Sequence, residues 1–596
     1  MQAIILAAGR GRRMEPLSRH CHKALLDVGG TTILGRALDS LVSAGVSPIT
    51  VVTGYRADDI VNFIEAEYAD ADVRYVANEH YATTNNIVSL ALALENLDYD
   101  RDVVLVECDL IFDPRLIKEL AAYPGRNVAL VDRYRTGMDG TVVAIENGYV
   151  SQVFPTSSQG ADFRYHDKYK TLNIYRFDRS FCQQTLRPMV SAYAHHVDAN
   201  SYYELVLGML ANIPQHRIAA QVVAESDWVE VDDPNDLSVA KFAFEPMARP
   251  ALLDRYFGGH WAFDILDFSL PRNAYFPTAS MHAAMRHSLP DVITGYGSTQ
   301  EVLDEKLRLY LGCEPGRATL LAGASQAYPV LGQLYSGARV ACPAPTFGEY
   351  SRAFPHALRY EDRPGIDVDG LARIARDVDL LVVVNPNNPT GSTVPTESIY
   401  EMAASTPSTH FFVDESFIAF SGLPSLVSML ELEPLPNVTV LTSLGKVFGV
   451  PGLRLGYMYS CGDAIRGALA DVMPIWGVNA LAEFFLELVL KFKPDLDASI
   501  AATVAQRSRL RDELASLPYV GRVYESGANF LLAELRGAGP EAAAAIRAEL
   551  LATWKIEVKD VSAKFAGREP RLRIAVRTED DNSRLLAALK CVKSVR

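Results

Sequence analysis

The chain has 596 residues, of which 49% are hydrophobic and 22% charged, and a formal net charge of −15 at pH 7. This composition is typical of a folded protein and excludes a disordered one. Because a single hydrophobic core usually stops growing at about 250–300 residues, we expect two or more domains. The acidic balance argues against nucleic acid or an anionic membrane as a partner, so anionic ligands must be held by local basic residues.

The cysteines and the N-terminal segment favour a cytoplasmic protein. The seven cysteines are widely spaced and include no C-x-x-C pair, so neither a disulfide framework nor a zinc site is indicated. The apolar run of residues 3–8 is followed by Arg10, which makes it too short for a secretory segment or a membrane span. We expect this run to be a buried strand.

The first part of the chain alternates between predicted strands and helices. After the strand at residues 3–8 and a glycine-rich loop, we expect an amphipathic helix over residues 33–42, a stop at Gly45 and a strand over residues 49–53. Apolar runs at residues 103–106 and 128–131 continue the alternation as far as a short helix at residues 237–244. The pattern predicts an α/β domain over residues 1–244.

A second α/β pattern occupies the rest of the chain. Pro246 and Pro250 interrupt helical continuity, and we place a linker over residues 245–262 and a second domain over residues 263–596. Three apolar runs stand out in it, at residues 380–385, 410–414 and 438–444. Each ends where a residue of chemical interest begins, which is typical of ligand sites beyond the carboxyl ends of parallel strands.

The glycine-rich loop near the N-terminus has the features of a nucleotide site. It reads LAAGRGRRM from Leu6, and its backbone N–H groups could approach phosphate oxygens. Arg12, Arg13 and Lys23 add cationic charge around a triphosphate. A bare G-x-G loop is also compatible with a tight turn and solvated arginines, so the motif does not decide alone.

Carboxylates suited to a divalent cation follow two predicted strands. Phosphoryl-type transfer between two anions requires such a cation, held by carboxylates at strand ends. Asp109 follows the run at residues 103–106, and Asp232, with Glu230 as a helper, lies in WVEVDDPNDL from Trp228. An alternative interpretation of this acidic turn is a helix N-cap before a proline. The order and the strand context favour Mg²⁺ binding by Asp109 and Asp232.

The first 240 residues resemble the nucleotidyltransferases of the sugar-nucleotide and phosphocholine type, through LAAGRGRRM and through HKALLDVGG from His22. The resemblance implies a Rossmann-like α/β fold, a catalytic role for Lys23, and nucleotide binding by Ala8, Gly9, Gly11, Arg13 and Lys23. His22 stands where sugar-nucleotide members commonly carry proline, and TNN from Thr84 is similar to the phosphocholine and aminoethylphosphonate cytidylyltransferases. CTP is then the implied nucleotide, and Asn86 an implied substrate contact.

The second half offers a candidate for each group that pyridoxal phosphate requires: an amine, an acid for the ring nitrogen, a donor at O3′, a ring face and a phosphate cup. Lys446 precedes a glycine-proline turn, Asp414 ends a predicted strand, and NPNNPTG from Asn385 forms a rigid turn after another. An isolated buried lysine is costly unless it is functional, whereas an imine removes its charge.

Together with LAGASQAY from Leu321 and CPAPTFGEY from Cys342, these segments are similar to the fold-type-I aminotransferases over residues 263–596. The resemblance makes Lys446 the Schiff-base lysine and Asp414 the partner of the ring nitrogen. It assigns the other cofactor contacts to Ala324, Ser325, Phe347, Asn388, Ser443, Arg454 and, from a partner subunit of a homodimer, Tyr296. It assigns substrate contacts to Asn529, Arg573 and, as a second anion contact, Arg577.

Phe417 departs from the aminotransferase pattern, because many members carry a tyrosine at this position. Together with MPIWGVNALAE from Met473 and RIAVR from Arg573, it is more similar to the threonine-phosphate decarboxylase branch than to histidinol-phosphate aminotransferases. The resemblance therefore favours loss of a carboxylate over transamination. Which Cα bond stands perpendicular to the ring decides between them, and the sequence does not determine that angle.

A cytidylyltransferase joined to a decarboxylase-like domain resembles the bifunctional enzymes of phosphonate antibiotic biosynthesis. The resemblance implies transfer of CMP from CTP to a small anionic phosphonate or phosphate amino acid, such as 2-amino-4-phosphonobutyrate, and decarboxylation of the CMP-linked product. One alternative is a transaminase that makes 2-aminoethylphosphonate before its cytidylylation. Another is a regulator with a degenerate aminotransferase domain, which the nucleotide loop, the acidic balance and Lys446 disfavour.

Overall fold

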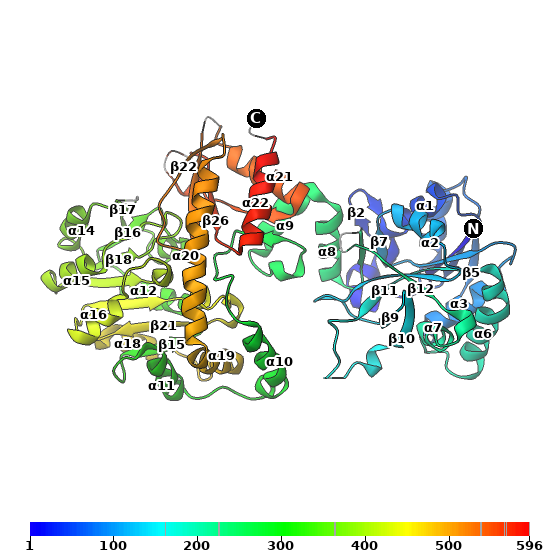
Figure 1. Cartoon of the computed structure of the whole chain (residues 1–596), viewed down its shortest axis with the longest axis horizontal. Helices are drawn as coiled ribbons and strands as arrows, with labels where there is room; N and C mark the ends of the chain where they lie inside the picture. The colour runs from blue at the N-terminus through cyan, green and yellow to red at the C-terminus, as the bar shows by residue number, and fades with distance from the viewer. Residues whose placement is uncertain are drawn as a thin grey trace. The chain divides into compact units, whose positions relative to one another are not determined.

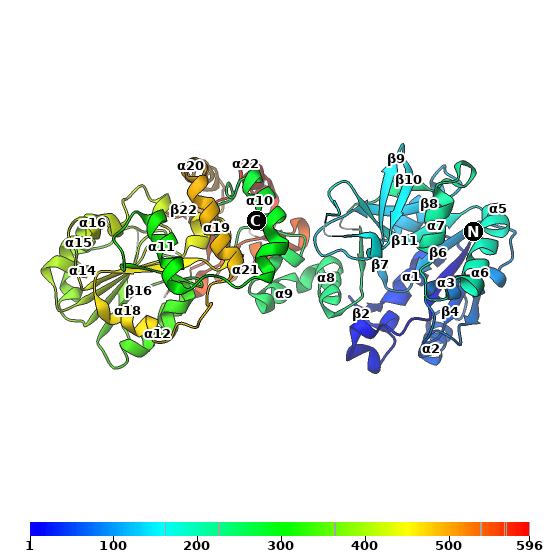
Figure 2. The same cartoon turned by 90° about the horizontal axis from the view of Figure 1, so that it is seen from below.

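The computed structural model describes residues 1–160, 162–224, 227–362, 365–536, 539–565, 567 and 569–594 (Figures 1 and 2). The chain divides into two compact units, Met1–Asp264 and Ile265–Arg596. Both are of the α/β class, with helices packed on a mixed sheet. Across the described ranges, none of the helices has the length and apolar character needed to cross a membrane.

The first unit is built on a large sheet. Its described part has nine strands in the order β5 (Val73–Ala77), β4 (Ile49–Thr53), β1 (Gln2–Ala7), β6 (Val103–Glu107), β11 (Tyr169–Phe177), β8 (Val128–Arg133), β12 (Ala219–Val222), β10 (Tyr149–Phe154) and β9 (Val142–Glu146). β1 pairs in parallel with both β4 and β6. The strands predicted at residues 3–8, 49–53, 103–106 and 128–131 are therefore confirmed, and the first three lie side by side with their carboxyl ends at one edge.

Helices cover both faces of this sheet, which explains why its central strands are continuously apolar. Alternate residues of β1 pack into two different cores. Ile4 and Leu6 belong to one core, and Ala3 and Ile5 belong to the other. The helices are α1 (Ile33–Ser43), α2 (Ala57–Glu67), α3 (Asn86–Glu95), α4 (Arg115–Ala122), α6 (Arg187–His196), α7 (Glu204–Ala211) and α8 (Pro234–Phe244). The helices predicted at residues 33–42 and 237–244 correspond to α1 and α8.

The range expected as a linker is folded onto the first unit. It contains η8 (Pro246–Ala248), α9 (Arg249–Tyr256) and η9 (His260–Ala262). Pro246 and Pro250 occupy first turns, where a missing N–H costs nothing, so these prolines begin helices rather than separate domains. Arg249 Nε donates to the Phe242 carbonyl at 2.7 Å, and the rings of Phe242 and Phe263 lie 4.9 Å apart.

The second unit is built on a seven-stranded sheet, counted over its described residues. The strand order is β15 (Ala318–Leu321), β21 (Gly456–Ser460), β20 (Val438–Thr442), β19 (His410–Asp414), β18 (Leu380–Val384), β16 (Val340–Ala344) and β17 (Leu358–Glu361). All neighbours are parallel except that β21 runs antiparallel to β15 and β20. The three predicted runs are thus the adjacent strands β18, β19 and β20, and their carboxyl ends share one edge.

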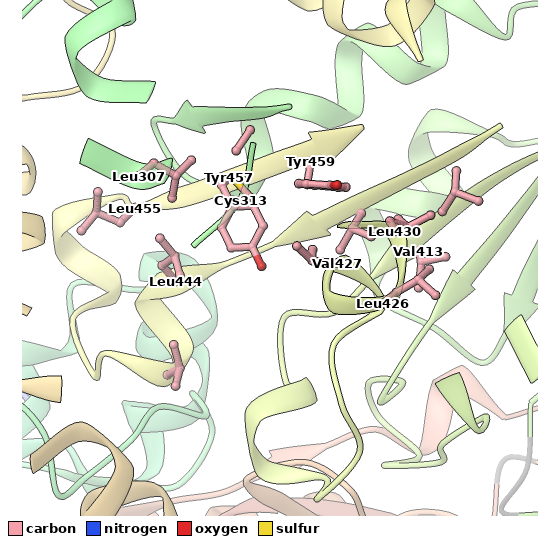
Figure 3. Packing of buried hydrophobic residues seen from close by; sticks show 14 of the residues in the cluster. Leu307, Cys313, Val413, Leu426, Val427, Leu430, Leu444, Leu455, Tyr457 and Tyr459 are labelled. Atoms are coloured by element: carbon pink, nitrogen blue, oxygen red, sulfur yellow. The ribbon is translucent and has the colours of Figure 1, made fainter. Parts of the chain in front are cut away.

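An apolar core lies against one face of this sheet (Figure 3). Tyr457 and Tyr459 of β21 lie among residues from α11 (Gln300–Leu311), α16 (Leu426–Leu432) and the segment after β20. Leu444 belongs to this cluster and begins α17 (Leu444–Val447), the short helix that contains Lys446. Packing of Leu444, Val447 and Phe448 into the core therefore fixes the turn that carries the lysine.

A smaller sheet completes the second unit. Its strands are β22 (Val520–Val523), β23 (Phe530–Leu535), β26 (Arg571–Ala575) and β25 (Lys559–Asp560), all antiparallel to their neighbours. The long helix α20 (Lys493–Ala515), orange in Figure 1, packs against β22 and β23, and α21 (Ala542–Trp554) and α22 (Glu579–Cys591) complete this layer. Asn529 and Arg573 both come from this sheet region.

Candidate active sites

The glycine-rich loop of the first unit is shaped around Lys23. Gly11 has a φ of +61°, and a Cβ there would lie 3.0 Å from Lys23 Cδ. Glycine is therefore suited to this position, because it adopts a left-handed backbone conformation readily and has no Cβ to crowd the Lys23 side chain. The Ala8 carbonyl accepts the Tyr55 N–H at 3.1 Å, and a Cβ at Gly9 would meet no atom within 4 Å.

Lys23 joins the two carboxylates predicted to hold a metal. A short ladder pairs β13 (Trp228–Glu230) with β7 (Leu110–Phe112), which sets the second acidic segment beside the first. Lys23 Nζ lies 2.7 Å from Asp109 Oδ2 and 3.3 Å from Asp232 Oδ1, and Arg13 lies 2.7 Å from Asp232 Oδ2. Burial alone would lower the pKa of Lys23, but the carboxylates of Asp109 and Asp232 raise it.

The acidic groups fit a hard divalent cation, although in a wider set than predicted. Carboxylate oxygens of Asp139, Glu230 and Asp232 lie within 4.8 Å of one another. Asp109 Oδ1 is buried and has no hydrogen-bond partner among the described residues. Asp232 is common to the predicted pair and to this group, while Asp139, which lies 2.9 Å from Arg13, was not predicted. Carboxylate oxygens are the donors that Mg²⁺ prefers.

Asn86 is partly buried and forms hydrogen bonds with two glutamates. Its Nδ2 lies 3.2 Å from Glu107 Oε1 and 3.4 Å from Glu204 Oε2, and its Oδ1 accepts the Tyr203 N–H at 3.0 Å. Burial raises the pKa of both glutamates. In this structure the Asn86 amide holds these side chains together, and the predicted substrate contact stays a prediction.

In the second unit, Asp414 is fixed at the end of β19. It is 4% exposed, accepts the Tyr350 hydroxyl at 2.7 Å and accepts the Ser416 N–H at 3.0 Å. Burial raises its pKa. Ser416 Oγ in turn accepts the Ser443 N–H at 3.0 Å, which ties the end of β19 to the segment before Lys446. The predicted acid is therefore buried, oriented and suited to a protonated ring nitrogen.

Ser325 and Arg454 form an anion-binding cup that fits a phosphate. Arg454 Nη2 donates to Ser325 Oγ at 2.6 Å. Gly323, beside the predicted Ala324, has a φ of +83°, and a Cβ there would lie 2.5 Å from the Arg454 guanidinium. Arg454 itself has a left-handed φ of +59°, an uncommon conformation for a non-glycine residue and one often found at functional sites.

Lys446 lies in a strongly cationic environment. Burial, followed by the nearby Arg573 and Arg454 guanidinium groups, lowers the pKa of Lys446 to about 8. A lysine with a lowered pKa carries more neutral amine near neutral pH, as imine formation requires. Together with the cup and Asp414, this amine fits pyridoxal phosphate.

Arg573 connects the smaller sheet to the turn after β18. Its Nη1 donates to Asn388 Oδ1 at 2.6 Å, and its Nη2 donates to the Ser269 carbonyl. Its guanidinium lies over the Phe530 ring. This ring packs edge-on against the Phe417 ring, with 5.2 Å between the ring centroids. Phe417 thus acts as an apolar support beneath Phe530. These contacts bring the predicted Asn388 and Arg573 together.

The remaining predicted residues occupy different surroundings. Asn529 is fully buried, and neither of its amide atoms has a hydrogen-bond partner in the described structure. Phe347 is 40% exposed at the start of α13 (Gly348–Ala353), as a residue that stacks on a ligand requires. Tyr296 is 80% exposed and stacks on Trp476 with a 4.2 Å centroid separation. Arg577 is bound to Asp581 and to the Asp267 carbonyl, and its role as a second anion contact stays a prediction.

Two residues that sequence reasoning missed complete these sites. Tyr350 lies within the quoted CPAPTFGEY segment, but only Phe347 was chosen from it. Lys170 is 2% exposed, is the second residue of β11, and lies 3.1 Å from Glu230. A lysine inside a strand that is otherwise buried was the available indication, because an unpaired charge there is costly.

Each of the two parts of the chain matches a known protein family. Residues 3–161 match the MobA-like NTP transferase domain, and residues 264–589 match the aminotransferase class I and II family. The chain belongs to the aminotransferase class I and II family and carries a nucleotidyltransferase domain ahead of that part. It is therefore an enzyme that combines nucleotidyltransferase and pyridoxal-phosphate-dependent domains.

One similar protein aligns over nearly the whole of this chain. The chain is 32% identical to CMP-5'-(3-aminopropyl)phosphonate synthase of Streptomyces rubellomurinus, over 99% of this chain and 94% of the relative. It is 28% identical to L-serine phosphate decarboxylase of Sulfurospirillum multivorans, over 50% of this chain and 80% of the relative. It is 32% identical to histidinol-phosphate aminotransferase 1 of Burkholderia lata, over 48% and 80% respectively.

Removal of Lys23 should destabilise the first unit. In Lys23→Met, Asp109 is left buried without its cation, and we expect a loss of roughly 3–5 kcal/mol of unfolding free energy. Adding Asp109→Asn should recover much of this loss. Urea-dependent hydrogen exchange in β1 and β6 measures it in the intact chain, with the exposed Lys118→Met as control. Additive effects of the two substitutions would show that the pair does not couple.

The reactivity of Lys446 should follow its lowered pKa. Because only the neutral amine forms an imine, the rate at which cofactor-free protein incorporates pyridoxal phosphate should rise with pH, with a midpoint near pH 8. Absorbance kinetics between about pH 6 and pH 10 measure it, with Lys446→Arg as control. A midpoint near the ordinary lysine value would contradict the environment described for Lys446.

Proposed function

We propose that the first unit transfers CMP from CTP to a phosphonate oxygen of a small anionic amino acid, and that the second unit decarboxylates the CMP-linked product. The acceptor we favour is 2-amino-4-phosphonobutyrate. The observation that carries the proposal is the presence in one chain of two separate anion sites, Lys23 with Arg13 beside paired carboxylates and Lys446 with Arg454 and Arg573. The two-part relative that acts in aminopropylphosphonate synthesis supports this reading.

In the first unit, the cations would act on the triphosphate. An oxygen of the phosphonate would attack the α-phosphorus of CTP, and the bond to pyrophosphate would break. Lys23 and Arg13 would stabilise the negative charge that develops. Asp109 and Asp232, with Glu230 and Asp139 nearby, would hold Mg²⁺, whose charge would weaken their present bonds to Lys23 and Arg13 and turn both cations toward the phosphates.

In the second unit, the residues would hold the amino acid and its leaving group. Pyridoxal phosphate, when bound, supplies the electron sink for the electron pair left when carbon dioxide departs. Asp414 would keep a proton on the ring nitrogen, Asn388 would bond O3′, and Arg454 with Ser325 would hold the phosphate. Arg573 would bind the substrate carboxylate or another anion, and Lys446 would return a proton to Cα.

The second unit would work as a homodimer. Tyr296 is exposed and forms with Trp476 a stacked aromatic pair on the surface, which a partner subunit would cover. In the dimer, Tyr296 would reach the phosphate cup of the other subunit. The site would then be incomplete in an isolated chain.

Two substitutions should separate the activities. With CTP, Mg²⁺ and 2-amino-4-phosphonobutyrate, we expect Lys23→Ala to abolish pyrophosphate release and to leave cofactor absorbance intact. Lys446→Ala should abolish carbon dioxide release and cofactor absorbance while pyrophosphate release continues. Pyrophosphate without carbon dioxide in the unmodified protein, accompanied by amino-group exchange with a keto acid, would instead identify the second unit as a transaminase.

Mixed dimers should test the shared site. A subunit with Lys446→Ala combined with a subunit with Tyr296→Ala yields one site with both native residues and one site lacking both. Coexpressed and purified through two different tags, the mixed dimer should regain up to half of the unmodified decarboxylation, far above either variant alone. No recovery in a dimer of verified composition would refute a role for Tyr296 across the interface.

A further inference from the structure

His22, the residue immediately before Lys23, has no part in the proposed CMP transfer. Its side chain is 0% exposed, although histidine is only intermediate in its tendency to be buried. Its Nδ1 accepts the Ala24 N–H at 3.1 Å, which caps the short helix η3 (Lys23–Leu25). Because Nδ1 accepts a hydrogen bond, the neutral ring carries its proton on Nε2.

The Nε2–H of His22 faces the glycine-rich loop. Burial, followed by the charge of Lys23, lowers the pKa of His22 to about 4, and the Gly9 backbone opposes this effect. A backbone group that favours the protonated ring is a carbonyl, because an N–H would favour the neutral ring. Nε2 is buried and completes no hydrogen bond of normal geometry with a described residue. The Gly9 carbonyl is therefore the acceptor that the loop offers to Nε2.

The preceding carbonyl of the loop is also held from the inside. The Ala8 carbonyl accepts the Tyr55 N–H at 3.1 Å, and the Tyr55 ring lies 6.3 Å from the His22 ring between centroids. A Cβ on Gly54 would lie 2.8 Å from the Ala8 oxygen, so glycine allows the segment after β4 to approach the loop. Tyr55 and His22 thus lie together behind two successive carbonyls.

Fixing a carbonyl also fixes the N–H of the same peptide unit. In a trans peptide the C=O and the N–H point in opposite directions, and neither peptide bond of Gly9 is cis. With the Ala8 and Gly9 carbonyls directed inward, the N–H groups of Gly9 and Arg10 point away from Tyr55 and His22. Neither N–H donates to a backbone carbonyl in the described structure. Successive N–H groups of this kind bind phosphate oxygens.

We propose that His22 is a positioning residue for the nucleotide, whose Nε2–H holds the Gly9 carbonyl and thereby directs the Arg10 N–H at the triphosphate. The inference rests on the proposed use of CTP. His22 does not touch the nucleotide and acts through the loop. This gives the buried imidazole a function that does not require a charge on the ring.

Two substitutions separate the roles of the two ring nitrogens. An asparagine side chain reaches the position of Nδ1, and a glutamine side chain reaches that of Nε2. His22→Asn can therefore still cap η3 but cannot hold Gly9, whereas His22→Gln can hold Gly9. The probes are CTP, inorganic tripolyphosphate and cytidine, each titrated into the full chain with Mg²⁺ and without acceptor.

We expect His22→Asn to bind CTP and tripolyphosphate about 10- to 150-fold more weakly, the range for a hydrogen bond to a charged group, and to bind cytidine as before. His22→Gln should bind CTP within about threefold of the unmodified protein. In pyrophosphate release, the loss in His22→Asn should appear in the KM for CTP and not in the KM for the acceptor. The exposed His196→Asn is the control and should behave as the unmodified protein.

Hydrogen exchange of the unmodified protein tests the loop without any substitution. Tripolyphosphate should slow exchange of the Gly9 and Arg10 amides, because their N–H groups would then be bonded to phosphate oxygens. Unchanged exchange at both amides would overturn the proposal, whether or not the variants fold.

The outcomes separate this inference from the proposed function. Normal CTP binding by folded His22→Asn, an equal loss for cytidine, or His22→Gln as weak as His22→Asn would each overturn the positioning role. If tripolyphosphate binding and amide exchange follow the expectations but CTP supports no transfer, the role of His22 stands and the proposed use of CTP is refuted.

Discussion

The compensation of buried charge at the ends of parallel strands is the constraint on which both sites depend. In the first unit, Lys23 is 8% exposed and is stable there only because Asp109 and Asp232 face it. The same contacts join the segment that contains Lys23 to the residues that follow β6 and β13. In the second unit the sign is reversed, because Arg454 and Arg573 lie near Lys446 and lower its pKa, while Asp414 opposes them. The first site thus offers carboxylates for a metal ion, and the second offers cations for an anionic cofactor and substrate.

Much of the fold follows from local pattern. The runs at residues 380–385, 410–414 and 438–444 are apolar because β18, β19 and β20 are covered on both faces, and their polar followers meet at one edge for that reason. Lys446, Asp414 and Asn388 were therefore predictable from their segments. The linker prediction differed from the structure because a proline that interrupts one helix is equally suited to begin the next.

Contacts between distant segments were harder to predict. The pairing of β7 with β13 joins residues about 120 positions apart and decides that Lys23 bridges both acids, which no local pattern contains. Asp139, from the segment between β8 and β9, contacts Arg13, and Lys170 of β11 contacts Glu230. The two glutamates that hold Asn86, Glu107 and Glu204, come from β6 and α7. The ion pair of Arg577 with Asp581, one helical turn onward, is local in sequence, but its hydrogen bond to the Asp267 carbonyl is not.

In the proposed order, the first unit attaches CMP before the second unit removes the carboxylate, so the nucleotide is part of what the second unit recognises. The most direct measurement is the release of labelled carbon dioxide from carboxyl-labelled 2-amino-4-phosphonobutyrate by the intact protein, with pyridoxal phosphate and Mg²⁺, in the presence and absence of CTP. The account predicts release that requires CTP and follows pyrophosphate after a lag. Release at the same rate without CTP would contradict it, because decarboxylation would then precede or ignore CMP attachment.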